Sequence, residues 1–255
     1  MISIMEFKSK KKWTWWVILF WLLIWEIGAR LLNQEILLVS PFVVFQRLFQ
    51  LLKDSHNWFL IGASMIRVMS GFLLAMILGV LLAYLAYRWN WFKTLMNPVF
   101  YTVKSIPVAS FVILILVWVK ANALAPVISF LVGLPIFYDQ ILKALESQNP
   151  SLEEMSIVFH ISKKKKFRYL TLAQILPYLE TACSLAIGFC WKAGMAAEVI
   201  GLPDGAIGSQ LYEAKVFLDT TSLFAWTLLV IILSSLMDRM VQIGIHKMIK
   251  EVLRS

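Results

Sequence analysis

The side chains that could do chemistry in this sequence are few, and several of them lie inside long apolar stretches. Asp139, Lys192 and Glu198 each stand in such a stretch. An ionisable group at that position usually faces water or protein and pairs with another charge, or it marks a route for a solute or ion. Lys192 could therefore face an anion, or it could pair with Asp139.

Common catalytic and nucleotide-binding motifs are missing from the sequence. It has no Gly-Lys pair, so it lacks the glycine-rich loop and lysine with which many ATPases hold phosphates. The three histidines do not form a His-Glu-x-x-His zinc motif. Cys183 and Cys190 lie in one apolar run, which indicates free thiols on a helix and neither a disulfide framework nor a metal site.

The elements that carry these residues are predicted to be membrane helices. Hydrophobic residues make up 60% of the 255, charged residues only 15%, and the mean hydropathy is +0.76. A soluble domain of this size cannot bury so much apolar surface. Because the runs are continuous and do not alternate, helices are favoured over a barrel. We predict six spans, near residues 13–32, 65–87, 99–119, 123–143, 178–200 and 221–243.

The first span follows a basic segment that resembles the start of a signal peptide. The stretch after Lys12 is about 20 residues long, enough to cross a bilayer, and has no convincing small-residue cleavage site. We therefore expect it to be retained as a transmembrane helix. Basic residues flank the apolar runs throughout, which indicates membrane orientation and argues against nucleic-acid binding.

The distribution of positive charge predicts how the chain is oriented. With the N-terminus in the cytoplasm, 16 of the 24 lysines and arginines fall on the cytoplasmic side, 4 fall in outer loops and 4 lie in or at the ends of spans. The positive-inside rule then places both termini in the cytoplasm.

The longest polar stretch between spans, about 144–177, is predicted to be a cytoplasmic hairpin. Its first half, Ser151 to His160, follows Asn149-Pro150, a start signal for a helix. Leu152, Met155 and Phe159 fall on one face, and Glu153 and Glu154 lie in the first turn, where carboxylates are favoured. This helix could insert into a groove of a partner or lie on the inner leaflet.

The same hairpin resembles the cytoplasmic signature of permeases from ABC importers that depend on a binding protein. The signature reads Glu-Ala-Ala, three residues, Gly, then about nine residues to Ile-x-Leu-Pro. Here Glu154-Met155-Ser156 stands for the first three residues, His160 replaces the glycine and Ala173 replaces the proline. Because glycine permits a tight turn, His160 could move the helix end to Ile161-Ser162.

An ordered series of further motifs resembles the subgroup of nitrate, sulfonate, taurine and bicarbonate importers. The series covers about residues 36–245 and includes Ser40-Pro41, the Ser64, Arg67, Val68, Gly71 and Phe72 group, Pro107 with Trp118, and Trp191, Ala197, Glu198, Gly201 and Gly208.

The resemblance implies an all-α membrane fold of the type I importer permease, with a first helix and N-terminus (1–35) before a core domain (36–255). It also implies two separate ATPase subunits that hold the ATP and Mg²⁺, a second permease copy and an extracytoplasmic solute-binding protein, in a bacterial cell membrane. The chain itself would hold no cofactor or metal and would perform no catalysis. The solute would be a small anion such as a sulfonate, or a pyrimidine or vitamin precursor. The alternatives are a secondary transporter or channel subunit, and an intramembrane enzyme.

The resemblance also assigns roles to individual residues. Leu152, Glu153, Glu154, Met155, Ser156, Phe159 and His160 would couple the permease to the ATPase. Lys192, Glu198, Asp139 and Pro107 are candidates for the solute path or gate, although Glu198 could instead cap backbone amides. Glu26 and Arg30 are spaced to pair on one helix face, and Arg67 could hold a carboxylate or the outer loop in place or could contact solute.

Overall fold

The computed structural model describes residues 14–254, and every regular element in that range is a helix. Lys8, Lys10, Lys11 and Lys12, which we expect beside the first span, lie outside the described residues. In chain order the helices are α1 (Thr14–Leu32), α2 (Pro41–Lys53), α3 (Ser55–Arg88), α4 (Asn90–Ser105), α5 (Val108–Leu116), α6 (Ala121–Glu146), α7 (Pro150–Val158), α8 (Lys163–Lys166), the π-helical turn η1 (Phe167–Thr171), α9 (Leu172–Gly201), α10 (Ile207–Val216) and α11 (Thr220–Arg254).

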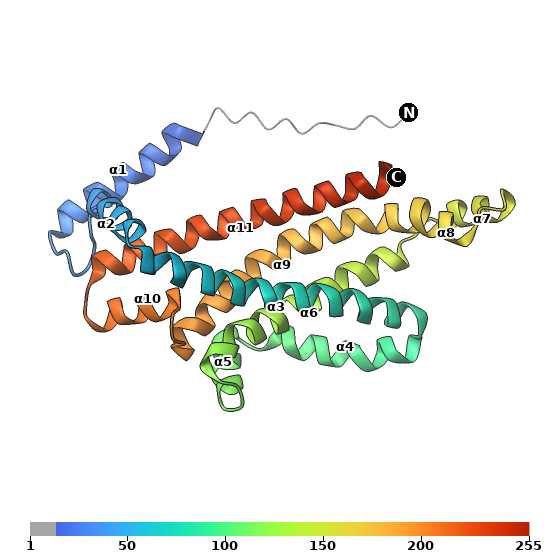
Figure 1. The fold of residues 1–255 in the computed structure, drawn as a ribbon, viewed down its shortest axis with the longest axis horizontal. Helices are drawn as coiled ribbons and strands as arrows, with labels where there is room; N and C mark the ends of the chain where they lie inside the picture. Colours follow the sequence, from blue (N-terminus) through green and yellow to red (C-terminus); the bar gives the residue numbers. More distant parts are fainter. Residues whose placement is uncertain (1–13, 255) are drawn as a thin grey trace.

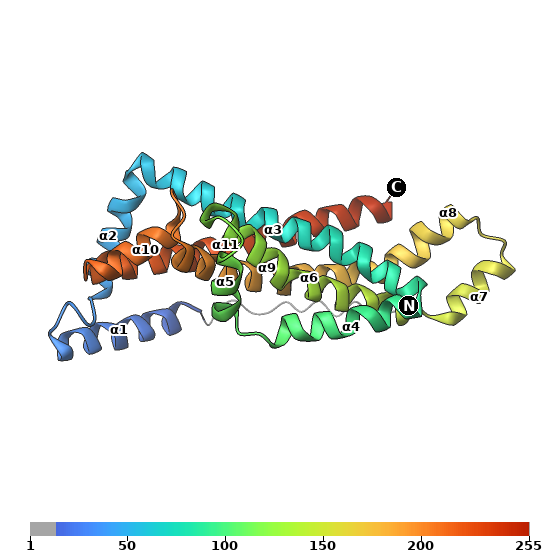
Figure 2. The same ribbon diagram turned by 90° about the horizontal axis from the view of Figure 1, so that it is seen from below.

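Four long helices, α3, α6, α9 and α11, run along the long axis of the molecule (Figures 1 and 2). Helices α2 and α10 lie together at one end, and α7 and α8 lie at the other. We call residues 33–67 with 198–219 the α10 end, and residues 147–162 the α7 end. Helix α1 contacts the bundle mainly near α2, where the Trp25 indole donates to the Val39 carbonyl over 3.0 Å.

Five helices in the described range are long and apolar enough to cross a membrane: α1, α3, α6, η1 with α9, and α11. They coincide with five of the six predicted spans, and all of them except α1 extend beyond the predicted limits. Helix α3 begins at Ser55 and not near 65, because Asp54 accepts a hydrogen bond from the His56 amide and starts the helix there.

The prediction of one continuous span over 99–119 is wrong. Helix α4 begins at Asn90, and the chain bends by 103° between α4 and α5. The cause is Pro107: the residue before a proline is pushed out of the helical region, and Ile106 accordingly has extended angles. The two short helices count as a sixth span only if the bent pair is taken together.

The hairpin predicted over 144–177 is also shorter than expected. Helix α6 continues to Glu146, and the chain is helical again from Lys163, so only 147–162 with α7 lies between the long helices. After Gly201 the chain turns and then forms α10. Its apolar residues Ile207 and Ala214 are buried against the bundle.

The centre of the bundle is the close packing of α3 against α6. A Cβ at Gly71 would lie 2.2 Å from the Pro126 carbonyl oxygen, and one at Gly79 would lie 2.5 Å from the Cβ of Phe137. Only residues without a side chain permit this approach between helix backbones. Gly188 on α9 differs from these two, because nothing lies within 4 Å of its added Cβ.

Polar groups within the bundle are satisfied between helices. The Ser129 hydroxyl on α6 donates to the Cys190 carbonyl on α9, and the Cys190 thiol donates to the Ser129 carbonyl, each over 3.1 Å. Trp191, also on α9, donates its indole N–H to the Val230 carbonyl on α11. These hydrogen bonds fix the helices relative to one another, because the hydrophobic effect does not drive helices together within a lipid bilayer.

Candidate functional site

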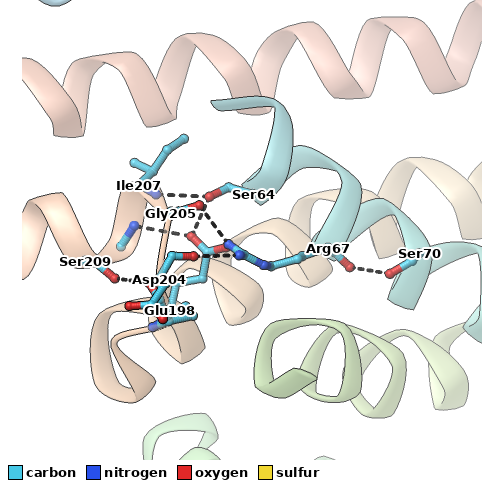
Figure 3. A network of polar contacts seen from close by, with 10 residues as sticks. Ser64, Arg67, Ser70, Glu198, Asp204, Gly205, Ile207 and Ser209 are labelled. Carbon is cyan, nitrogen blue, oxygen red and sulfur yellow. Dashed lines mark hydrogen bonds and ion pairs between the residues drawn. The ribbon is translucent and has the colours of Figure 1, made fainter. Parts of the chain in front are cut away.

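Glu198 is the centre of a buried polar network at the α10 end (Figure 3). Its side chain is fully buried near the end of α9. The Ser64 hydroxyl on α3 donates to Glu198 Oε2 over 2.7 Å, and the Gly208 amide of α10 donates to the same oxygen over 3.2 Å. The other oxygen, Oε1, accepts from Arg67 over 3.4 Å. A buried carboxylate is tolerated when it is paired and hydrogen-bonded in this way.

Arg67 extends the network to the loop between α9 and α10. Its guanidinium donates to the carbonyl oxygens of Asp204 over 2.9 Å and Gly205 over 3.1 Å, in addition to its ion pair with Glu198. One side chain of α3 therefore fixes both the end of α9 and the loop that follows. Of the roles considered for Arg67, its contacts are those of a residue that holds a carboxylate and the loop together.

The network supplies the cap that α10 does not provide for itself. The residue before the helix is Ala206, which has no side-chain acceptor. The Ser64 oxygen accepts from the Ile207 amide over 3.0 Å, and Glu198 accepts from the Gly208 amide. These are the first two free N–H groups of the helix, where acceptors and negative charge are favoured. Glu198 thus caps backbone amides, which was one of the two roles considered for it.

Gly208 is required for this approach. A Cβ at Gly208 would lie 2.3 Å from the Cβ of Glu198 and 2.6 Å from the backbone nitrogen of Val199. Its backbone therefore contacts α9 directly, with no room for a side chain. Because the donors and acceptors of this cluster are used by one another, it is arranged to hold the turn between α9 and α10 and not to perform a reaction.

Glu26 and Arg30 on α1 form the ion pair that their spacing predicts, with 2.7 Å between the Arg30 Nε and Glu26 Oε1. The other carboxylate oxygen accepts from the Ser40 hydroxyl over 2.5 Å. Ser40 precedes α2. The charged pair therefore connects the end of α1 to the start of α2.

Lys192 and Asp139 do not pair. Asp139 on α6 forms an ion pair with Lys104 on α4, a partner that we did not expect for it. The Lys104 ammonium is therefore paired with a carboxylate of the same chain. Lys192 is exposed, and among the described residues it has no ion pair or hydrogen bond. It follows Leu185 and Phe189 at helical spacing on α9, and both of these side chains are exposed as well.

Pro107 lies at the break between α4 and α5 and precedes the first residue of α5. The chain therefore changes direction at Pro107, between two short helices that are long and apolar enough to cross a membrane only when taken together. Whether solute passes this point stays a prediction.

At the α7 end the predicted coupling residues form a helix that projects beyond the long helices (Figures 1 and 2). Asn149 caps it by accepting from the Ser151 amide over 3.0 Å. Glu154, Met155 and Phe159 are exposed, Leu152 is half-buried and Ser156 is buried. The side chain of Glu153 lies outside the described ones. Ile157, Val158 and Phe159 expose 64%, 73% and 71% of their surface, so apolar side chains here have no cover from this chain.

His160 adopts the left-handed conformation, with φ of +48°. The helix therefore ends at Val158, and the expectation that His160 moves its end to Ile161-Ser162 is wrong. The His160 amide donates to the Ile157 carbonyl and the Ile161 amide donates to the Ser156 carbonyl, over 3.0 Å and 2.9 Å. This is the Schellman ending of a helix, which glycine normally occupies.

Two residues of these sites were not recognised as functional from the sequence. Ser64 appears there only as part of a motif, and Lys104 is not assigned to a site. The spacing of Ser64 and Arg67 on one face of α3 is a signal that could have paired them. No group of three or more His, Cys, Asp or Glu side chains able to hold a metal occurs in the part of the chain that the structure describes.

Comparison with known proteins gives one family match. The family described as "Binding-protein-dependent transport system inner membrane component" matches residues 75–250. The chain is 20% identical to a protein of Bacillus subtilis named as an aliphatic sulfonates transport permease, over 89% of this chain and 83% of that protein. It is 25% identical to a formylaminopyrimidine transport permease of Halalkalibacterium halodurans, over 72% and 74%. It is 26% identical to a bicarbonate transport system permease of Synechococcus elongatus, over 60% and 55%.

Proposed function

This chain belongs to the family of inner-membrane components of binding-protein-dependent transport systems, and we propose that its helix α7 couples it to a separate ATPase. The protein is a multi-pass permease subunit of an ABC importer. Such a subunit is not itself an enzyme. In our proposal, ATP and Mg²⁺ are bound by two ATPase subunits, a second permease copy completes the path, and an extracytoplasmic protein delivers the solute.

The exposed apolar end of α7 is the observation that carries the coupling proposal. Ile157 and Val158 close the helix and Phe159 follows as its C-cap, and α7 contacts little of its own chain and lies outside the membrane-length helices. A projecting helix end of this kind suits a groove on a partner, where its apolar side chains become buried. The capping by Asn149 and the Schellman ending keep the short helix formed while it has no partner.

The orientation that we propose places the α7 end in the cytoplasm, together with the C-terminal end of α11. The two lie toward the same end of the bundle (Figure 1). The lysine and arginine count supports this orientation, because the basic residues Lys163 to Lys166 and Arg168 follow α7. ATP-driven closure of the ATPase pair would then move two α7 helices together, and the long helices would transmit the motion and open the path alternately to each side.

The solute path, in our proposal, follows the face of α9 that carries Leu185, Phe189 and Lys192. A cation without a protein partner at membrane depth is expensive unless it faces water or a solute. The relatives' names indicate two solute classes, small anions and a pyrimidine. Lys192 would attract an anion.

The coupling proposal is tested by charge substitution on α7. Glu154→Lys or Phe159→Lys should weaken co-purification of the ATPase and make ATP hydrolysis independent of the binding protein, because a lysine would enter the partner's groove. The matched control is Ser162→Lys, which adds the same charge at an exposed site after the helix. Wild-type association and stimulation in both α7 variants would contradict the assignment of 151–160.

The role of Lys192 is tested separately by transport. Lys192→Met should slow uptake of an anionic solute while leaving association with the ATPase intact. An unchanged rate for an identified anionic solute would remove Lys192 from the path.

A further inference from the structure

We propose that the Lys104–Asp139 ion pair forms the centre of a solute-binding site within the permease, which takes a small, flat heteroaromatic molecule without net charge. The inference rests on the proposed transport function and selects a neutral solute over the anion considered for Lys192, so the two assignments compete and the probes below decide between them. It starts from two cavities that have this ion pair as a common wall.

The outer of the two cavities lies on the side of the helix break. It is an open cleft with a volume of about 410 Å³, lined by residues of α4, α5, α6 and α9. Its walls are mostly apolar and include Phe111, Pro135 and Phe189. The bend at Pro107 creates this space. In a straight span α5 would continue along the direction of α4, whereas after the bend it crosses α6.

The second cavity lies on the other side of the ion pair, toward the start of α4. Its volume is about 420 Å³, and its walls include Asn97, Phe100, Tyr101 and Tyr138. The rings of Phe100 and Tyr138 lie 4.2 Å apart between centroids. Both volumes are in the range of pockets that hold small organic molecules, and a nitrate or bicarbonate ion would fill only a small part of either.

The Tyr138 hydroxyl is a second observation, besides the two cavities, that indicates a ligand. Tyr138 is 2% exposed, and its hydroxyl has no hydrogen-bond partner among the described residues. A buried hydroxyl without a partner is costly, and native proteins rarely retain one without a use. Tyr138, which precedes Asp139 in the chain, is among the residues that line the second cavity. A solute with hydrogen-bonding groups would satisfy the hydroxyl.

The charges around the cavities favour a solute without net charge. Among the residues that line the two spaces, Lys104 and Asp139 are the charged ones, and they neutralise each other. Both side chains are nearly half exposed (44% and 47%), and an added anion would have to compete with Asp139 for Lys104, the cation among these lining residues. A neutral heterocycle can accept a hydrogen bond from Lys104 and donate one to Asp139 at the same time. Its ring can contact the aromatic side chains of the walls.

The site can be tested by protection of an introduced cysteine. In the full chain purified with its ATPase, Val103→Cys places a thiol in the wall of the outer cavity. The matched control is Val99→Cys, one turn earlier on α4 and not among the lining residues. Cys183 and Cys190 are buried, so background labelling by a maleimide should be low. Cytosine and nicotinamide are the neutral probes, and nitrate and ethanesulfonate are the anionic ones.

We expect at least one neutral probe to slow labelling of Val103→Cys and not of Val99→Cys, and the anions to protect neither. Adding Tyr138→Phe should raise the probe concentration for half-protection about fivefold, the effect of one hydrogen bond. Lys104→Gln should also weaken protection. Lys93→Gln should not, although Lys93 forms a comparable ion pair with Glu146 between the same two helices, with 2.6 Å between nitrogen and oxygen.

Protection by the anions instead, protection by none of the four probes, or protection that survives Tyr138→Phe would each overturn the site. Because Tyr138→Phe removes a group without a partner, the variant should fold at least as stably as the wild type, so a loss of protection cannot be ascribed to unfolding. ATPase co-purification and its stimulation by the binding protein are measured on the same preparation. Their failure would contradict the proposed function, whereas their success with unprotected Val103→Cys would contradict only the site.

Discussion

The two ends of the molecule differ in that one has its buried polar groups hydrogen-bonded within the chain, whereas the other leaves apolar side chains exposed. At the α10 end, the buried Glu198 is bonded to Ser64, Arg67 and the Gly208 amide, so the end of α9, the loop and α10 hold one another. At the α7 end, Val158 and Phe159 expose most of their apolar surface, and the helix depends on caps at its own termini.

The difference indicates which end is complete without other proteins. An end whose donors and acceptors satisfy one another is stabilised by the fold and gains little from a partner. An end that leaves apolar side chains uncovered gains free energy when a partner buries them. We therefore expect substitutions at the α10 end to change the stability of the chain, and substitutions at the α7 end mainly to change its association.

The largest expected effect is that of Glu198→Ala. It leaves Arg67 and the first amides of α10 without their acceptor, and breaking a buried pair in this way should cost about 3 kcal/mol of unfolding free energy. Thermal unfolding of the full chain in detergent measures it, with Glu213→Ala, an exposed carboxylate on α10, as the control. Equal loss in the two variants would mean that the buried network does not stabilise this end.

Gly208→Ala should have the next largest effect. The added Cβ would lie 2.3 Å from the Cβ of Glu198, so α10 must move away from α9, at a cost of about 2 kcal/mol. Gly62→Ala on α3 is the control, because nothing lies within 4 Å of its Cβ, and alanine there should be neutral or slightly stabilising. If Gly208→Ala unfolds at the wild-type temperature, the close approach is not needed.

His160→Gly should change the α7 end in the opposite direction, by stabilising it. A left-handed residue with a Cβ costs about 1 kcal/mol relative to glycine, so the substitution should slow hydrogen exchange of the amides that close the helix end. His246→Gly, within α11, should destabilise its helix instead. Faster exchange at Ile161 in His160→Gly would show that the histidine side chain contributes to this turn.

The smallest effect is expected from Asp219, which precedes α11 at the α10 end. Burial raises the pKa of its carboxyl, but hydrogen bonds from the side chain and amide of Ser222, together with nearby Arg47, lower it by more, so the net shift is downward. A lowered pKa means that the stabilisation is present above the unfolded value of about 3.9 and is lost as the pH falls through the folded value. Unfolding followed between pH 6 and pH 3, as about the usable range, should show a smaller pH dependence in Asp219→Asn than in the wild type.

Some parts of the fold could be predicted from residue patterns alone. Long uncharged runs must be membrane helices because the backbone has no other partner in lipid, and five predicted spans coincide with helices. The Glu26–Arg30 pair follows from a spacing of four residues on one helix. The start of α7 at Asn149-Pro150 is equally local.

Other parts depend on contacts between residues far apart in the chain. The partner of Asp139 is Lys104, 35 residues away, and no periodicity links them. The same holds for Ser64 and Glu198, which are 134 residues apart. Pro107 ends the helix locally, but the direction that α5 takes after the 103° bend depends on packing, because Val112 is buried with residues of α6 and α9.

Hydrophobicity, helix period and motif order are properties of neighbouring residues, so the bilayer as solvent, the helices and the family follow from the residue order alone. Which charges meet, which of them line the cavities, and why Gly208 and His160 occupy their positions follow from the folded chain. Those outcomes depend on how closely two helices approach and on how each chain segment ends, and both are set by packing between distant parts of the chain.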